Sequence, residues 1–252
     1  DIGTPSGWEH LDYILGGIRK GEVIVVTAET GCGKTTWCVN LSVNLANKGK
    51  KVWINSYEMN PKTIHRKIAS IVLDKNLKIR AFTEKEKQEY KDWCHPRHLH
   101  INQGNDGSDI ETLRADIEIA SLAYGIEYVI IDHLDYIQSS KAKNVTESID
   151  DCMRKLHSIA MEYNVGIILV AHIKQVQGAI RAITLNDLKG SASIKQYPDA
   201  IIILHRMDVL DMSQKNKIQL SVVKNRLLGK QFTINLNYNP VSDSFTQPPK
   251  GY

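Results

Sequence analysis

The 252-residue sequence has few cysteines and no long apolar run. Its four cysteines show no Cys-x-x-Cys spacing, which fits a reducing compartment better than a disulfide framework. No apolar stretch approaches the length of a membrane span, and the N-terminus has no apolar signal-peptide region. These absences predict a protein of the cytoplasm or of an organelle matrix that is neither secreted nor held in a membrane. We also expect free thiols at Cys32, Cys38, Cys94 and Cys152.

The sequence also has only a small excess of positive over negative residues. The formal net charge is only +4, which by itself does not indicate nucleic-acid binding. Any such binding must depend on where the positive residues lie. The hydrophobic share of 42% is ordinary for a globular protein, and 252 residues are enough for one large domain with a substantial core.

The clearest motif is the loop at residues 28–35, Ala-Glu-Thr-Gly-Cys-Gly-Lys-Thr. It follows an apolar, β-branched run at residues 23–27 that is typical of a buried parallel strand, and it precedes a helical pattern at residues 36–45. Glycines in such a loop let backbone N–H groups face phosphates, and the helix N-terminus adds partial positive charge. Ala28 replaces the first glycine of the pattern, but that position need not touch phosphate.

The loop therefore predicts nucleotide binding. Lys34 is expected to reach the β and γ phosphates, and the Thr35 hydroxyl to bind Mg²⁺. The remaining residues expected to contact the nucleotide are Glu29, Thr30, Gly31, Cys32, Gly33 and Thr36.

An acidic residue closes the apolar strand expected at residues 128–132, and another comes shortly after the strand expected at residues 51–56. Catalytic groups of open α/β sheets lie just beyond the carboxyl ends of strands. Asp132 is placed to hold the Mg²⁺ hydration shell beside Thr35. Glu58 is placed to orient and deprotonate the water that attacks the γ-phosphate. From these residues alone, Glu58 is equally well explained as a solvated carboxylate near a helix N-terminus.

Other segments predict the covering elements of such a sheet. Asp135 is expected to be exposed, and Ser108 to cap the helix at residues 109–124. The run at residues 94–100 holds four potential metal ligands but no second ligand pair at zinc-finger spacing, so we expect a turn before an edge strand at residues 99–102. From Val241 onward the chain is expected to be mobile. Further helices are predicted at residues 61–73, 84–93 and 144–163, and strands at 166–171, 200–204, 217–224 and 231–238.

Residues 7–17, which include Leu11-Asp12 and Gly16-Gly17, precede Gly21-Glu22 and the phosphate loop. This lead-in resembles that of RecA-like ATPases. Ser-Tyr-Glu-Met at residues 56–59 resembles the Ser-Leu-Glu-Met stretch that carries the catalytic Glu of DnaB-type replicative helicases, which favours the catalytic role of Glu58. The resemblance runs from Thr4 to about Phe245.

This resemblance implies an α/β fold, a RecA-like P-loop NTPase with a mostly parallel twisted sheet flanked by helices and an antiparallel C-terminal hairpin. It divides the chain into a lead-in at residues 1–20, an ATPase domain at 21–245 and a mobile tail at 246–252.

The resemblance also implies roles for residues that carry little signal alone. His172 ends an apolar strand, where a lone histidine is more often structural. Ring helicases such as the phage primase-helicases and mitochondrial Twinkle resemble this chain in having a His there, which implies contact with the γ-phosphate and a report of hydrolysis. Arg206 is expected near the base, and Tyr238 to stack on it. Lys-Asn-Arg at residues 224–226 resembles the Lys-x-Arg of DnaB and Twinkle, so Lys224 and Arg226 are expected to reach into a neighbouring subunit's site.

Residues 173–196 are basic and rich in small side chains. Asp-Leu-Lys-Gly-Ser-Ala-Ser-Ile-Lys-Gln at 187–196, followed by Asp199, resembles the element that replicative ring helicases place at the central channel. Because aromatics are nearly absent, we expect contact with a single-strand backbone and no base stacking. The expected DNA contacts are Lys174, Arg181, Lys189, Gly190, Ser191 and Lys195.

Taken together, these features predict the ATPase motor of a DnaB-like or Twinkle-like DNA helicase. It is expected to hydrolyse ATP or another NTP with Mg²⁺, to form a homo-oligomeric, hexameric ring on single-stranded DNA at a replication fork, and to have a primase or loader domain upstream. Two alternatives stay open: a RecA-like or RadA-like recombinase, against which residues 187–196 and 224–226 argue, and a KaiC-like regulatory ATPase that binds no DNA. A small-molecule kinase is disfavoured because the sequence offers no arginine-bearing lid segment.

Overall fold

The computed structural model describes residues 2–104, 108–172, 192–207 and 214–248. The strands of its main sheet are β1 Val23–Ala28, β2 Val52–Ser56, β3 Leu99–Gln103, β5 Tyr128–Asp132, β7 Gly166–His172, β8 Ala200–Arg206, β9 Lys217–Asn225, β10 Phe232–Asn239 and β11 Ser244–Thr246. A separate short pair consists of β4 Ser108–Asp109 and β6 Ile137–Gln138. The helices are α1 Glu9–Leu15, α2 Lys34–Asn47, α3 Pro61–Leu73, α4 Glu84–Cys94, α5 Ile110–Tyr124, α6 Val145–Glu162 and α7 Ser193–Gln196, with a 3-10 turn, η1, at Leu134–Tyr136.

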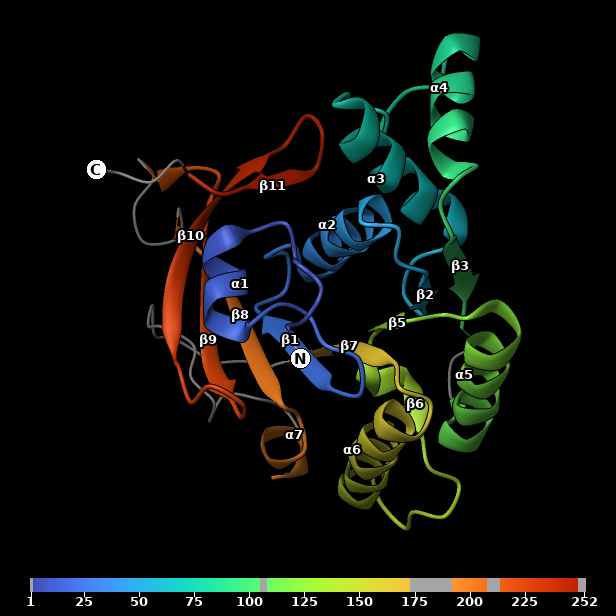
Figure 1. Cartoon of the computed structure of the whole chain (residues 1–252), viewed down its shortest axis with the longest axis vertical. Helices are drawn as coiled ribbons and strands as arrows, with labels where there is room; N and C mark the ends of the chain where they lie inside the picture. Colours follow the sequence, from blue (N-terminus) through green and yellow to red (C-terminus); the bar gives the residue numbers. More distant parts are fainter. Residues whose placement is uncertain (1, 105–107, 173–191, 208–213, 249–252) are drawn as a thin grey trace.

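The main sheet has the strand order β11-β10-β9-β8-β1-β7-β5-β2-β3 (Figure 1). From β8 to β3 in this order, neighbouring strands are parallel. Strands β9, β10 and β11 continue the sheet in antiparallel pairs. The predicted mostly parallel sheet with an antiparallel C-terminal hairpin is confirmed. Strand β3 forms one edge of the sheet, as its sequence indicated.

Two apolar clusters hold the helices against the sheet, one on each face. All six residues of β1 are buried, and they alternate between the clusters because successive side chains in a strand point to opposite faces. Ile24 and Val26 belong to the cluster that includes Trp37 of α2. Val25 belongs to the cluster that includes Leu156 of α6. Figure 1 shows α2 and α3 on one side of the central strands and α5 and α6 on the other.

Helix starts follow local capping chemistry. Asn60 Oδ1 accepts from the Thr63 N–H at 2.9 Å, ahead of a proline in the first turn of α3. The expectation that Ser108 caps α5 is wrong, because Asp109 Oδ1 accepts from the Glu111 N–H at 2.8 Å. Ser108 instead pairs with a residue of β6. A carboxylate also suits the positive end of a helix better than a hydroxyl does.

The C-terminal segment is anchored and not mobile over residues 242–246. Ser242 and Asp243 are almost fully buried, and Phe245 belongs to the core. The Phe245 N–H donates to Asn40 Oδ1 at 3.1 Å, and its carbonyl oxygen accepts from Trp8 Nε1 at 3.1 Å. The expectation of a mobile chain from Val241 is therefore wrong for this stretch, since its aromatic side chain fills space beside α1 and α2.

We expect Phe245→Ala to lower the free energy of unfolding by about 3–5 kcal/mol, the usual loss for a buried phenylalanine. Phe245 is 6% exposed and its ring lies 5.2 Å from that of Tyr238. Urea unfolding followed by tryptophan fluorescence measures the loss. Phe232→Ala is the matched control, because Phe232 is 60% exposed and its truncation should cost less than about 1 kcal/mol. Equal losses would contradict the anchoring.

Other expectations about composition can be compared directly with the structure. All four cysteines are free thiols, as predicted. Asp135 is exposed, also as predicted. Among the helices of the described residues, none has the length and apolar character needed to cross a membrane.

The parallel strands gather their carboxyl ends at one edge of the sheet. Ser56 pairs with Asp132 across β2 and β5, and Ala28 pairs with His172 across β1 and β7. Arg206 ends β8 on the other side of β1. Polar residues that lie far apart in the sequence therefore meet around the loop that follows β1.

Candidate functional site

The loop between β1 and α2 turns at two glycines with left-handed backbone. Gly31 has φ 80° and Gly33 has φ 86°, angles that a residue with a Cβ adopts only with strain. Gly33 is the N-cap of α2, so the unpaired N–H groups of the first helical turn face outward at the loop. Lys34 Nζ donates to the carbonyl oxygens of Ala28 at 3.0 Å and Glu29 at 3.3 Å. Burial lowers the pKa of Lys34.

Thr35 and Asp132, the pair predicted to hold Mg²⁺, are in contact. Thr35 Oγ1 donates to Asp132 Oδ2 at 2.7 Å. Asp132 is 2% exposed, and burial raises the pKa of its carboxyl to about 6, against the hydrogen bond from Thr35. Its other oxygen, Oδ1, is buried and accepts no hydrogen bond from the residues that the structure describes. A hydroxyl beside a carboxylate with an oxygen to spare fits a hard divalent cation such as Mg²⁺.

Glu58 lies at the same place, just beyond β2. One ligand atom each from Glu58, Asp132 and His133 can be chosen so that all three lie within 4.8 Å of one another. Lys34 is close enough to both carboxylates for their charges to raise its pKa against the effect of burial. The Glu58 side chain is 51% exposed, so water reaches it. The structure thus brings Lys34, Glu58 and Asp132 to one site, as the sequence analysis required.

His133 is a site residue that the sequence analysis did not single out. It is 5% exposed, with Nδ1 3.5 Å from Glu58 Oε2 and its ring centroid 4.1 Å from that of His172. Burial, helped by the neighbouring His172, lowers the pKa of His133 to about 4, so its imidazole is neutral at pH 7. Its only signal in the sequence is its position directly after Asp132, which belongs to no spaced motif.

His172 ends β7 beside the start of the phosphate loop. It pairs in register with Ala28, and its side chain is half-buried. The sensor role itself stays a prediction.

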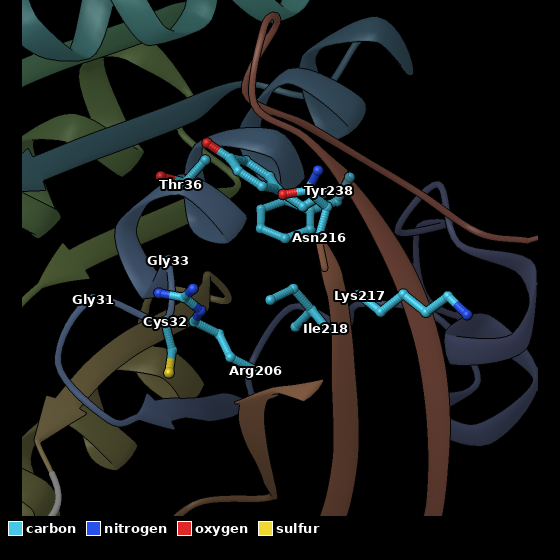
Figure 2. Close-up of a pocket in the computed structure, with 10 residues that line it drawn as sticks. Gly31, Cys32, Gly33, Thr36, Arg206, Asn216, Lys217, Ile218 and Tyr238 are labelled. Carbon is cyan, nitrogen blue, oxygen red and sulfur yellow. The ribbon is translucent and has the colours of Figure 1, made fainter. Parts of the chain in front are cut away.

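A pocket of about 230 Å³ opens beside the phosphate loop (Figure 2). Arg206 and Tyr238, the two residues predicted to lie at the base, both line it. Figure 2 shows the Arg206 side chain pointing toward the loop residues. Phe245 of β11 also lines the pocket and lies against the phosphate loop, since its Cζ is 3.5 Å from where a Cβ on Gly33 would lie. The full lining consists of Gly31, Cys32, Gly33, Thr36, Arg206, Asn216, Lys217, Ile218, Tyr238 and Phe245.

Sequence reasoning missed Asn216, Lys217, Ile218 and Phe245 in this lining. They lie directly before β9, at its start and in β11, segments whose sequences carry no nucleotide-binding motif. Only the pairing of β8, β9, β10 and β11 brings these residues to the phosphate loop.

Of the predicted DNA contacts, only Lys195 lies within the described residues. It is half-buried in α7, and its carbonyl oxygen accepts from Lys224 Nζ at 2.8 Å. The predicted contacts outside the described residues are Lys174, Arg181, Lys189, Gly190 and Ser191.

Lys224 and Arg226 lie at the opposite end of the sheet from the phosphate loop. Lys224 pairs with Ile201 and Ile218 with Arg206, so about 17 Å of β8 separates the two ends at roughly 3.3 Å per residue. Arg226 is bound locally instead. Its guanidinium donates to Asp199 Oδ1 at 2.9 Å and to the carbonyl oxygens of Gln196 and Tyr197 at the end of α7, and its side chain is 47% exposed.

Comparisons with known proteins agree with this geometry. A protein of Chlamydia psittaci described as a probable plasmid replicative DNA helicase is 28% identical over 264 residues, covering 97% of this chain and 55% of that protein. The replicative DNA helicase DnaC of Bacillus subtilis is 26% identical over 242 residues, covering 89% of this chain and 52% of that protein. The chain therefore spans about half the length of these curated relatives.

Two solved structures share the fold at 22% sequence identity, each with a TM-score of 0.88 and 98% of this chain covered. One is described as a DnaB-like replicative helicase and its interactions with primase, of which 64% is covered, and the other as an ATPase domain, of which 92% is covered. The family described as the DnaB-like helicase C-terminal domain matches residues 3–247. Neither the recombinase nor the KaiC-like alternative is favoured, and the chain belongs to the DnaB-like helicase C-terminal domain family.

Proposed function

We propose that this chain is the NTP-hydrolysing motor of a ring-shaped replicative DNA helicase that moves along single-stranded DNA and unwinds duplex. The observation that carries the proposal is the meeting of Lys34, Thr35, Asp132 and Glu58 at one edge of the sheet. Family membership supports the same activity. The curated relatives named helicases are about twice as long as this chain.

In this proposal the phosphates of ATP or another NTP lie on the loop at residues 28–35. Lys34 leaves the carbonyl oxygens of Ala28 and Glu29 for the β and γ phosphates. Thr35 and Asp132 hold Mg²⁺, which neutralises phosphate charge when bound. Glu58 accepts the proton of the attacking water, and His172 contacts the γ-phosphate. Arg206 and Tyr238 hold the base in the pocket of Figure 2.

Lys224 and Arg226 are assigned to a neighbouring copy of the chain. Their distance of about 17 Å along β8 from Arg206 supports action in trans, because neither side chain can span that distance to its own nucleotide. In such an arrangement identical subunits repeat head to tail, each completing the next subunit's site, and they form a closed ring when the rotation between neighbours closes. We propose a hexamer.

The remaining partners follow from the family. We propose that residues 174–195 contact the backbone of single-stranded DNA through Lys174, Arg181, Lys189, Gly190, Ser191 and Lys195. A primase or loader is the candidate protein partner, and the compartment is the one in which DNA is replicated, a bacterial or phage-infected cytoplasm or an organelle matrix.

An unwinding assay on forked DNA tests the proposal. With ATP and Mg²⁺ the protein should separate the strands, and Lys34→Ala should abolish unwinding because the phosphates lose their main positive partner. Size measurement with and without nucleotide, run beside it, should show a ring. Single-strand affinity should fall log-linearly with salt, as expected when phosphate contacts release counterions.

Two results would contradict the proposal. Unwinding that persists in Lys34→Ala would show that the loop is not the motor site. Absence of single-strand binding at low salt, with hydrolysis intact, would point to a regulatory ATPase that binds no DNA.

A further inference from the structure

Asp243 is a buried carboxylate that the proposed chemistry does not use. It is 1% exposed and has three side-chain partners. Lys78 Nζ and the Tyr238 hydroxyl donate to Oδ1 at 2.6 Å and 2.5 Å, and Lys67 Nζ donates to Oδ2 at 3.0 Å. The pKa of Asp243 is lowered, because these hydrogen bonds outweigh the opposing effect of burial. The group is therefore ionised at neutral pH.

One of these partners lines the pocket beside the phosphate loop, and a second contacts another lining residue. The Tyr238 ring lines the pocket from β10. Lys67 Nζ also donates at 3.0 Å to the hydroxyl of Thr36, which lines the pocket at the start of α2. Asp243 therefore connects two residues of the pocket lining, Tyr238 through one hydrogen bond and Thr36 through two, by way of Lys67.

We propose that Asp243 is a positioning residue for nucleotide binding, which holds the Tyr238 ring as the stacking platform for the base. The inference rests on the proposed function, in which the pocket takes the base of an NTP. Because the Tyr238 hydroxyl is committed to Asp243, it does not read the edge of the base. Stacking tolerates every base, so the platform adds affinity without selecting one NTP.

A merely structural role for the carboxylate is distinguishable from this one. The segment is already held by its backbone, since the Asp243 carbonyl oxygen accepts from Asn40 Nδ2 at 2.8 Å and the Phe245 N–H donates to Asn40 Oδ1. The side chain adds the contacts to Tyr238 and to the two lysines. Loss of the Asp243 charge should therefore loosen the Tyr238 ring in the pocket wall, while the backbone of the segment stays in place.

Two variants separate these contacts. Asp243→Asn keeps the size of the side chain and suits the backbone, because φ is 58° and asparagine enters this left-handed region readily. The Asp243→Asn change removes the negative charge to which Tyr238, Lys67 and Lys78 donate. Tyr238→Phe removes only the hydroxyl and keeps the ring, so it reports on the single hydrogen bond if Asp243→Asn folds poorly.

The experiment compares ATP with inorganic tripolyphosphate, which has no base, by titration calorimetry in Mg²⁺. Asp243→Asn should weaken ATP binding about tenfold, more than Tyr238→Phe does, because it also removes the charge that Lys67 and Lys78 contact. Tyr238→Phe should weaken it about threefold, because the ring remains but is no longer held. Affinity for tripolyphosphate should change less than about twofold in both. The double variant should bind ATP no more weakly than Asp243→Asn alone, because both changes remove the same hydrogen bond between Tyr238 and Asp243.

The controls are Asp92→Asn and Tyr13→Phe, the same changes at exposed positions outside the pocket, which should leave both affinities unchanged. Unchanged ATP affinity in the two pocket variants overturns the inference, and so does a parallel loss for both ligands. Wild-type protein that binds ATP no more tightly than tripolyphosphate overturns the inference alone. Wild-type protein that binds neither ligand overturns the proposed function with it.

Discussion

Glu58→Gln is expected to reduce NTP turnover by about 10²-fold to 10⁴-fold, the range for loss of a general base. Glutamine has nearly the same shape as glutamate but cannot take the proton of the attacking water. Nucleotide affinity should stay within about threefold, because Lys34, Thr35 and the loop N–H groups are unchanged. Steady-state phosphate release measures turnover, and titration with a slowly hydrolysed nucleotide measures affinity.

The matched control is Glu118→Gln, an exposed glutamate on α5, which should hydrolyse NTP at the wild-type rate. Normal turnover in Glu58→Gln would remove Glu58 from the mechanism. Turnover and affinity lost together would mean that Glu58 shapes the nucleotide site and does not act as the base.

Arg226→Ala is expected to lower turnover in the assembled protein by about 10³-fold to 10⁵-fold, as for other arginines that reach a transferring phosphate in trans. The planar guanidinium stays charged and can hold two γ-phosphate oxygens at once. The loss should appear only where subunits contact one another. The decisive measurement mixes Arg226→Ala with Lys34→Ala, two variants that are each inactive.

In mixed rings, a subunit with an intact Lys34 can receive Arg226 from a neighbour whose own site is inactive. Turnover should therefore return to a measurable fraction of the wild-type rate. Arg114→Ala, which removes an exposed ion pair with Glu162 on the far helices, should behave as wild type throughout. If mixing restores no activity, Arg226 does not act across a subunit boundary.

The sequence predicted the elements whose signal is local. Apolar β-branched runs, such as the one at residues 23–27, predicted the strands, and spaced glycines before Lys34 predicted the loop. The ends of the predicted strands and helices fall within two residues of those observed. Asp132 and Glu58 were found because they lie at or just beyond the carboxyl end of a strand, a position with a known meaning in parallel sheets.

Residues whose role comes from distant partners could not be found in this way. Asp243 lies in a polar stretch near the C-terminus that looks mobile by composition. Its partners Lys67 and Lys78 lie more than a hundred residues earlier, and no periodicity connects them. His133 is similar, because its neighbours Glu58 and His172 come from two other strands. In both cases only the pairing of strands creates the site.

Asp199 has a consequence for how neighbouring sites communicate. Its Oδ1 accepts from Arg226, while its Oδ2 accepts from the Val23 N–H at 2.9 Å, the first residue of the strand that carries the phosphate loop at its far end. This strand is a stiff rod about 20 Å long at roughly 3.3 Å per residue. The half-exposed ion pair between Arg226 and Asp199 is worth at most about 1 kcal/mol. Breaking it therefore costs little free energy. In the proposed ring, a subunit whose Arg226 moved to its neighbour's nucleotide would give up this ion pair at the start of its own β1, so β1 would connect its own nucleotide site to the site that its Arg226 serves.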